Sequence, residues 1–209
     1  MQIAVLTFDA FNELDSFVVA HLLNRQADKG WKAYITAPTA RVASRNGVVV
    51  DAQKPLEFTA EADAVIVGSG WKTREVMLDG AITPRISLDP QRQLIASQCS
   101  GAMILAKMGL LTGVPACTDH FTRPALAEMG VTIVDRAFQA NGNVATAGGC
   151  LSSQYIATWM VAKRLGVEVA RKMIYDVAPI GEKDEYIARA LGAVMPFVDA
   201  DVKVGAAAQ

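Results

Sequence analysis

The residue best suited to chemistry is a cysteine at the junction of a strand-like and a helix-like segment. In the stretch QLIASQCSGAMILAKMGLLTG (93–113), a buried-strand pattern ends at Gln98 and a helix-forming apolar run follows Gly101. Cys99 therefore lies on the turn, where free N–H groups and the positive end of a helix dipole favour a thiolate over a thiol. Gly101 permits the close backbone approach of a sharp turn, as in a nucleophile elbow. The pattern predicts a nucleophilic cysteine, and an inert buried cysteine is the alternative.

The elements that would position Cys99 are short apolar runs rich in Val and Ile, which are typical of strands buried on both faces. These runs are IAVL (3–6), AYIT (33–36), AVIV (64–67), LIAS (94–97) and VTIV (131–134). Helix-like segments between and after them cover 13–28, 101–108 and 151–164. The first helix is expected to bury an apolar side made of Leu14, Phe17, Val18 and Leu22. His21 lies on or beside this side. Alternation of strand and helix predicts an α/β fold with a parallel sheet between two helix layers.

Two Asn-Gly pairs punctuate this alternation. Asn46-Gly47 and Asn141-Gly142 stand between β-prone runs and predict tight hairpins, which we expect to be small antiparallel additions to the main sheet. The chain of 209 residues shows no internal repeat or low-complexity linker. We therefore expect a single domain over 1–200 and a loose tail over 201–209.

The composition argues against several classes of function. The 20 Lys and Arg residues oppose 21 Asp and Glu residues, and no block of like charge occurs, so binding to a nucleic acid backbone is not expected. Acidic residues follow the apolar start MQIAVLTF at once, which leaves no room for an export signal, and no later run has membrane length. These features predict a cytoplasmic protein that binds neither nucleic acid nor membrane.

The cysteines and histidines give no spacing that would hold a metal. Cys99, Cys117 and Cys150 form no CxxC pair, so neither a disulfide framework nor a thiolate zinc site is predicted. Cys117 and Cys150 are expected to be buried fillers rather than resolving thiols. His21 and His120 are too few and too far apart for a histidine-rich centre. With no GxGxxG or GxxxxGK motif either, we expect no cofactor, whether metal or nucleotide.

The surroundings of Cys99 resemble the ThiJ/PfpI family, relatives of class I glutamine amidotransferases and of the parkinsonism-associated deglycase. The family's order of Cys-small-Gly, Leu-Ala, Gly-Leu-Leu and Gly is matched by Cys99-Ser100-Gly101, Leu105-Ala106, Gly109-Leu110-Leu111 and Gly113. Two later stretches also resemble family motifs, namely ACTDHF (116–121) and VATAGGCLSSQYIA (144–157). The resemblance spans most of the chain and implies a flavodoxin-like three-layer sandwich and a homodimer.

The resemblance further implies a carboxylate partner for the cysteine, drawn from the segment after the first strand. FNELD (11–15) holds two acids, and alignment by the preceding Leu14 selects Asp15 over Glu13. A carboxyl beside a thiolate in a partly dry pocket should have a raised pKa, which lets it donate a hydrogen bond or a proton. Asn12 followed by Asp15 is also a helix-capping pattern, and the residues alone favour capping.

A glycine-rich turn, VGSGW (67–71), follows the run AVIV. The resemblance implies that a backbone N–H of this turn helps to hold an oxyanion. Gly70 is the candidate donor in the turn, and the N–H of Ser100 is the second donor. Trp71 and His120, together with Phe121, are candidates for lining a small apolar pocket. Each of these residues taken alone is more often part of ordinary core or surface packing.

The residue after the cysteine separates branches of the family. Protease-like and glyoxalase-like branches often carry histidine there, whereas this chain has Ser100, which argues against peptidase activity. The isonitrile hydratase branch has a small hydroxyl residue at that position and a carboxylate matching Asp15. The chain departs from that branch after the acid, where Ser16-Phe17 replaces a Gly-Pro step. The resemblance thus implies a cysteine-dependent enzyme that adds water to a small isonitrile to give an N-substituted formamide.

Three alternatives remain open at this point. The first is conversion of an α-oxoaldehyde such as methylglyoxal, which needs the same thiolate. The second is a redox sensor or stress-binding protein in which Cys99 is oxidised to a sulfinate steadied by Asp15. The third is an amidotransferase-like fold without activity. Transcription-regulator relatives append a helix-turn-helix domain, and the segment after Ala200 is too short to supply one.

Overall fold

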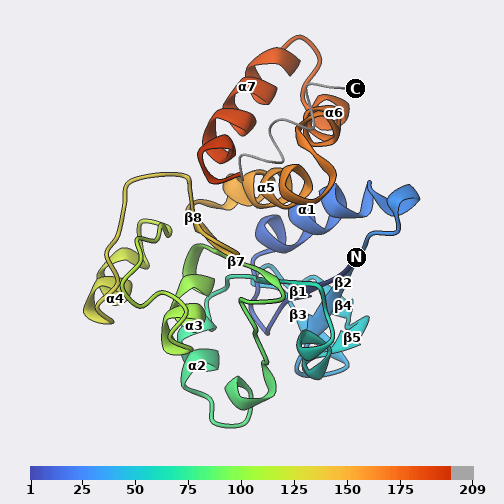
Figure 1. The fold of residues 1–209 in the computed structure, drawn as a ribbon. Coiled ribbons are helices and arrows are strands. Elements are labelled where there is room, and N and C mark those ends of the chain that lie inside the picture. Colours follow the sequence, from blue (N-terminus) through green and yellow to red (C-terminus); the bar gives the residue numbers. More distant parts are fainter. Residues whose placement is uncertain (199–209) are drawn as a thin grey trace.

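Within residues 1–198, seven strands form a central sheet in the order β5-β2-β1-β6-β7-β9-β8. This computed structural model describes residues 1–198 (Figure 1). The strands of the sheet are β1 (Gln2–Leu6), β2 (Lys32–Ala37), β5 (Lys54–Pro55), β6 (Ala64–Val67), β7 (Leu94–Gln98), β8 (Phe138–Asn141) and β9 (Val144–Ala147). All neighbours pair in parallel except β8 and β9. The predicted mainly parallel sheet is therefore confirmed.

Helices cover both faces of the sheet, as Figure 1 shows. One layer contains α1 (Glu13–Asn24), α5 (Ser153–Leu165), α6 (Val167–Val177) and α7 (Lys183–Val194). The other contains α2 (Thr73–Leu78), α3 (Ala102–Lys107) and α4 (Arg123–Glu128). The three-layer flavodoxin-like sandwich is thus confirmed. No helix in residues 1–198 combines the length and the apolar character needed to cross a membrane.

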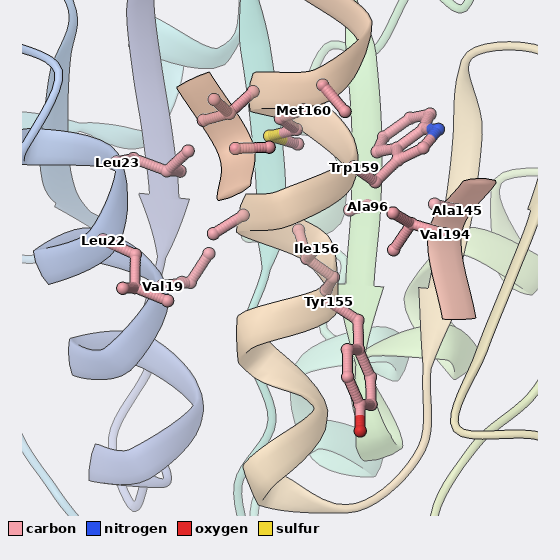
Figure 2. Close-up of a cluster of buried hydrophobic side chains, with 14 of the residues drawn as sticks. Val19, Leu22, Leu23, Ala96, Ala145, Tyr155, Ile156, Trp159, Met160 and Val194 are labelled. Atoms are coloured by element: carbon pink, nitrogen blue, oxygen red, sulfur yellow. The ribbon is translucent and has the colours of Figure 1, made fainter. Parts of the chain in front are cut away.

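The two layers have separate apolar cores because side chains alternate along each strand. Ile3 and Val5 of β1 point into the α1-α5 core, whereas Ala4 and Leu6 point into the α3-α4 core. Figure 2 shows the first core, in which side chains of α1 face those of α5 and Trp159 lies beside the sheet. This packing fixes the sheet whose ends carry the candidate site.

Four of the five predicted strand runs are confirmed, and VTIV (131–134) is wrong. Ile133 makes only an isolated bridge with Ala116. Val131 is buried in the α3-α4 core, and Ile133 packs against it. The run is apolar because it fills the space beside α4, so its composition imitates that of a buried strand.

Helix α1 buries its predicted apolar side only in part, since Phe17 and Val18 are half-buried at the edges of apolar clusters. Its buried residues are Asp15, Ser16, Val19, Leu22 and Leu23, while Leu14 is 46% exposed and His21 is exposed. Helix α1 is turned so that its first turn presents a carboxyl and a hydroxyl, rather than apolar groups, to the interior. Leu22 alone of the four predicted residues is fully in the core.

Both hairpins form, but only one joins the main sheet. Asn141-Gly142 connects β8 to β9 within it. Asn46-Gly47 connects β3 (Arg41–Ala43) to β4 (Val49–Asp51), which pair with each other in a separate two-stranded sheet. The expectation that this second hairpin extends the main sheet is therefore wrong. The tail predicted over 201–209 lies outside the described residues.

Candidate active site

Cys99 stands on a strained turn directly after β7. Its φ of +45° lies in the left-handed region, which it shares, among non-glycine residues of the described chain, with Ala10. Such a conformation costs about 1–3 kcal/mol and persists only where the surroundings impose it. A single 3-10 turn, Cys99–Gly101, leads into α3, and the hydroxyl of Thr118 donates to the Cys99 carbonyl at 2.8 Å. The expected elbow is present.

Gly101 makes the elbow possible by its lack of a side chain. A Cβ at this position would lie 2.5 Å from the carbonyl oxygen of Val67 and 2.7 Å from that of Gly68. Both distances are far below normal van der Waals contact, so the turn after β7 approaches the end of β6 more closely than any other residue would allow. The close approach brings Cys99 beside the glycine-rich turn 67–71.

Asp15 faces the sulfur of Cys99 from α1. The helix cap is supplied by Asn12, whose side chain accepts from the Leu14 N–H at 3.2 Å. Asp15 is free to turn inward and is fully buried. Its Oδ2 accepts a hydrogen bond from the Ser69 hydroxyl, and the Cys99 thiol donates to its Oδ1 across 3.9 Å. Capping therefore does not account for Asp15, which contacts a residue 84 positions away in the chain.

Burial is the largest influence on the pKa values of Asp15 and Cys99. Burial raises the pKa of Asp15, against the opposing hydrogen bond from Ser69. Burial also raises the pKa of the Cys99 thiol far above its usual range, and the charge of Asp15 raises it further. Burial therefore opposes the expected effect of the helix start, because Cys99 is only 4% exposed and its thiol form is favoured. The pair holds a proton that must move when the sulfur reacts.

Cys150 is a member of the site that the sequence did not reveal. Its sulfur accepts from the Asn12 side-chain amide at 2.9 Å. One ligand atom each of Asp15, Cys99 and Cys150 lie within 4.8 Å of one another. The prediction that Cys150 is a buried filler is wrong, since it is partly exposed and borders a cavity.

Cys117 is fully buried, as predicted. Its thiol donates to the Thr146 carbonyl at 2.9 Å, and burial raises its pKa to about 11. It does not border the cavity that Cys99 and Cys150 reach. This cysteine is therefore a natural control for experiments on the other two.

Gly70 and Ser100 contact each other and line the same cavity as Cys99. The Gly70 N–H points to the Ser100 hydroxyl at 3.4 Å, and that hydroxyl also lies 2.9 Å from the hydroxyl of Thr73. A Cβ at Gly70 would stand 2.4 Å from the Ala10 carbonyl oxygen, so only glycine fits there. The long contact leaves the Gly70 N–H weakly engaged and accessible to a stronger acceptor.

The cavity in front of Cys99 has a volume of about 720 Å³, a size suited to small molecules. Cys99, Ser100, Ser69 and Gly70 line it, as do Trp71 and His120. Trp71 is 74% exposed and His120 is exposed, so these two rings lie at the rim rather than in an enclosed wall. Asp15 itself is behind the lining and reaches the cavity through its partners, Cys99 and Ser69.

The sequence profile of the DJ-1/PfpI family matches residues 1–163. The chain belongs to this family. It is 26% identical over 176 residues to the isonitrile hydratase of Pseudomonas putida, a match that covers 82% of this chain and 75% of that protein. A relative of this chain at 26% identity is therefore an isonitrile hydratase.

Solved DJ-1/PfpI structures share the fold. A ThiJ/PfpI family protein from Pseudomonas syringae superposes with a TM-score of 0.73 at 23% identity, covering 93% of this chain and 87% of that one. DJ-1beta of Drosophila melanogaster gives a TM-score of 0.72 at 20% identity, covering 84% of this chain and 96% of that one. At these identities the likeness concerns the sandwich and its topology alone.

Within this DJ-1/PfpI site, Ser69 and Asn12 were also missed from the sequence. Ser69 lies inside the glycine-rich turn 67–71, and Asn12 belongs to a helix-capping pattern, but the sequence shows the side-chain partner of neither residue. Cys150 follows Gly149, whose φ is +88°, directly after β9. Because β9 is the parallel neighbour of β7, their carboxyl ends share one edge of the sheet, and that adjacency is the signal that could have found Cys150.

Proposed function

We propose that this DJ-1/PfpI protein is a cysteine-dependent hydratase that adds water to the carbon of a small isonitrile and releases an N-substituted formamide. The observation that carries the proposal is the contact between the Cys99 thiol and the buried Asp15 carboxyl at the edge of a cavity of small-molecule size. A nucleophile and a proton acceptor in direct contact are the minimum machinery for covalent hydration. The isonitrile hydratase relative supports the choice of substrate.

In the first step the sulfur of Cys99 bonds to the isonitrile carbon. The thiol proton moves to Asp15 and from there to the same carbon, giving a thioimidate, R–N=CH–S–Cys. Because the resting sulfur is a thiol, attack and proton transfer are coupled. Asp15 thus supplies what an isolated buried cysteine lacks, namely a base in contact with its proton.

In the second step a water oxygen bonds to the thioimidate carbon. One water proton reaches the substrate nitrogen through Asp15, for which the Ser69 hydroxyl, bonded to Oδ2 and lining the cavity, is the connection. The N–H groups of Gly70 and Ser100 stabilise negative charge as it develops in this step. Breakage of the carbon–sulfur bond releases the formamide, and the remaining water proton restores the thiol of Cys99.

Ser100 suits this chemistry better than peptide hydrolysis. Its hydroxyl is engaged with Thr73 and Gly70, and it offers no imidazole to protonate an amine leaving group. Hydration of an isonitrile expels no such group. The residue beside the nucleophile therefore favours addition over cleavage.

We also propose that the chain works as a homodimer in the cytoplasm. A second, smaller apolar groove of about 400 Å³ is bounded by Phe17, Leu151 and Val177, among others. Leu151 is 71% exposed, an unusual state for leucine beside other apolar groups, and a second copy of the chain would cover it. All three cysteines are free, as suits a reducing compartment.

Turnover by the purified protein tests the proposed activity. Consumption of a simple alkyl isonitrile, followed by loss of its infrared N≡C band and appearance of the formamide proton in NMR spectra, is expected for the wild type and for Cys117→Ser. Cys99→Ala should abolish it. Consumption of methylglyoxal instead would favour the α-oxoaldehyde activity. If neither substrate is consumed and dilute peroxide adds two oxygens at Cys99 alone, the redox-sensor alternative replaces the enzyme.

A further inference from the structure

Three potential metal ligands converge at the site although the chain spaces them far apart. Asp15 comes from α1, Cys99 from the elbow after β7, and Cys150 from the turn after β9. Their ligand atoms lie within 4.8 Å of one another. Within residues 1–198 this is the one such group of three or more His, Cys, Asp or Glu side chains.

The spacing suits a thiophilic divalent cation. Zinc binds thiolate sulfur at about 2.3 Å and carboxylate oxygen at about 2.0–2.2 Å, so neighbouring ligand atoms of a tetrahedral site are roughly 3.3–3.8 Å apart. The Cys99 sulfur is 3.9 Å from the Asp15 Oδ1. Side-chain movements of a few tenths of an ångström would bring this pair to zinc-binding distance. Two sulfur ligands select zinc-like ions over magnesium or calcium.

The groups around the ligands are arranged as a metal site requires. The Ser69 hydroxyl bonds to Oδ2 of Asp15, which holds the carboxylate and leaves Oδ1 directed at the cluster. The Asn12 amide donates to the Cys150 sulfur at 2.9 Å and orients it. Such outer hydrogen bonds fix ligand orientation and strengthen metal binding.

The cluster is reachable from solvent. Cys99 and Cys150 both line the large cavity, whereas Asp15 closes the cluster from behind. A cation can therefore enter past the two sulfurs, and its fourth position would face the cavity and take a water molecule. The site would be an open one, bound reversibly.

We propose that Asp15, Cys99 and Cys150 bind a thiophilic divalent cation such as Zn²⁺, and that the bound cation reversibly withdraws Cys99 from reaction. The two thiols release their protons to solvent when they coordinate, and no redox change occurs. Inhibition rests on the proposed hydratase function, but binding does not. Cys150, which takes no part in the hydration steps, acquires a role as the second sulfur ligand.

Cobalt(II) gives a direct readout of the ligand set, because thiolate coordination produces a charge-transfer band in the near ultraviolet. The wild type and Cys117→Ser are expected to bind one Co²⁺ with this band and to release it to one equivalent of Zn²⁺. Cys150→Ser, which retains Cys99 and Asp15, should bind at least tenfold more weakly and lose about half of the band. Circular dichroism of each variant establishes that it is folded.

Protection of Cys99 gives a second readout that needs no enzymatic activity. Zn²⁺ should slow alkylation of Cys99 by iodoacetamide, scored by peptide mass spectrometry, at least tenfold in the wild type and in Cys117→Ser but not in Cys150→Ser. Equal Co²⁺ or Zn²⁺ binding by Cys150→Ser and the wild type, or no thiolate band in either, overturns the proposal.

Separate measurements test the hydratase proposal and the metal-binding proposal. Isonitrile turnover measured in a metal chelator tests the hydratase alone. Turnover that persists unchanged under saturating Zn²⁺ overturns the metal proposal and leaves the hydratase standing. A thiolate band and Cys99 protection without any turnover support the metal site and remove the hydratase.

Discussion

Cys99 and Asp15 are two buried groups that would both be ionised only at high cost, so they titrate as a pair rather than as independent residues. Burial raises the pKa of each, and the carboxylate charge is the second cause of the raised pKa of Cys99. In the proposed mechanism, the carboxylate that suppresses the thiolate at rest also accepts the thiol proton during attack. Asp15 is therefore expected to have opposite effects on simple thiol reactivity and on turnover.

Asp15→Asn separates these effects. The substitution removes the repulsive charge, so the apparent pKa of Cys99, obtained from the pH dependence of iodoacetamide alkylation, should fall relative to the wild type. Isonitrile turnover should nevertheless fall by about a hundred to ten thousand fold, the usual range for a lost acid–base group. Glu13→Gln, an acid of the same helix bonded to Ser44 and Asn46, should change neither quantity. An unchanged or higher pKa of Cys99 in Asp15→Asn would contradict the electrostatic account.

The raised pKa of Asp15 also predicts how stability depends on pH. The folded state binds the Asp15 proton more tightly than the unfolded state, in which this carboxyl has a pKa of about 3.9. The contribution of the protonated Asp15 carboxyl to the free energy of unfolding is therefore complete below that pH. It is lost as the pH rises through the folded-state pKa. Asp15→Asn, which cannot ionise, should have a higher Tm than the wild type at neutral pH and a similar Tm near pH 3. Calorimetry at both pH values measures this, and a lower Tm of the variant at pH 7 would contradict it.

At the residue scale the sequence predicted Cys99 and Asp15 but not Cys150. A cysteine before a glycine at a strand-helix junction carries a local signal, and the resemblance supplied the acid. Cys150 and its partner Asn12 are 138 positions apart, and nothing local marks their contact. The sequence also did not show that burial favours the thiol form of Cys99, since a helix start is visible in a sequence whereas depth of burial is not.

At the scale of elements, the site depends on loops whose backbones approach one another so closely that only glycine fits at the contact. Gly101 lies against the end of β6, and Gly70 lies against the Ala10 carbonyl. These contacts join the elbow after β7, the glycine-rich turn after β6 and the loop after β1. The position of the Cys99 sulfur relative to Asp15 therefore follows from backbone packing.

Gly101→Ala tests the tightness of the elbow. The added Cβ would meet the Val67 and Gly68 carbonyl oxygens, and such overpacking typically costs about 1–3 kcal/mol. Gly192→Ala is the matched control, because Gly192 is in α7 with nothing near its added Cβ, and an alanine in a helix interior stabilises by up to about 1 kcal/mol. Urea unfolding should therefore give shifts of opposite sign, and two shifts of the same sign would contradict the packing described.

Strands were predicted correctly where an apolar run of the sequence also lies in the interior of the sheet. IAVL, AYIT, AVIV and LIAS are strands because they occupy the sheet interior, where apolar runs are required. VTIV has the same composition but packs beside α4, and composition cannot distinguish the two positions. The buried side of α1 was predicted only in part, because Asp15 and Ser16 are also buried, against the apolar periodicity.

At the scale of the whole molecule, parallel strand order brings distant loops to one edge of the sheet. β1, β6, β7 and β9 are consecutive neighbours, so the segments after them meet. The sequence predicted such a sheet but not the order of its strands, and the order is what joins Asp15, Cys99 and Cys150. The exposed apolar groove around Leu151 lies on the α1-α5 layer.

Leu151→Asp tests the proposed homodimer. A charge placed in the apolar groove should disfavour its coverage by a second copy, so sedimentation velocity should show a dimer for the wild type and a shift towards monomer for the variant. Leu78→Asp, at a leucine 64% exposed on α2 in the opposite layer, is the control and should remain dimeric. A monomeric wild type, or a variant as dimeric as the wild type, would contradict the assignment of this face.

The most direct measurement is mass spectrometry of the protein quenched in acid during isonitrile turnover. Covalent hydration predicts an adduct equal in mass to one isonitrile on the peptide that contains Cys99, present in the wild type and in Cys117→Ser. The adduct should be absent from Cys99→Ala, which should also form no formamide. Formamide production by Cys99→Ala at the wild-type rate would show that this sulfur is not the group that attacks.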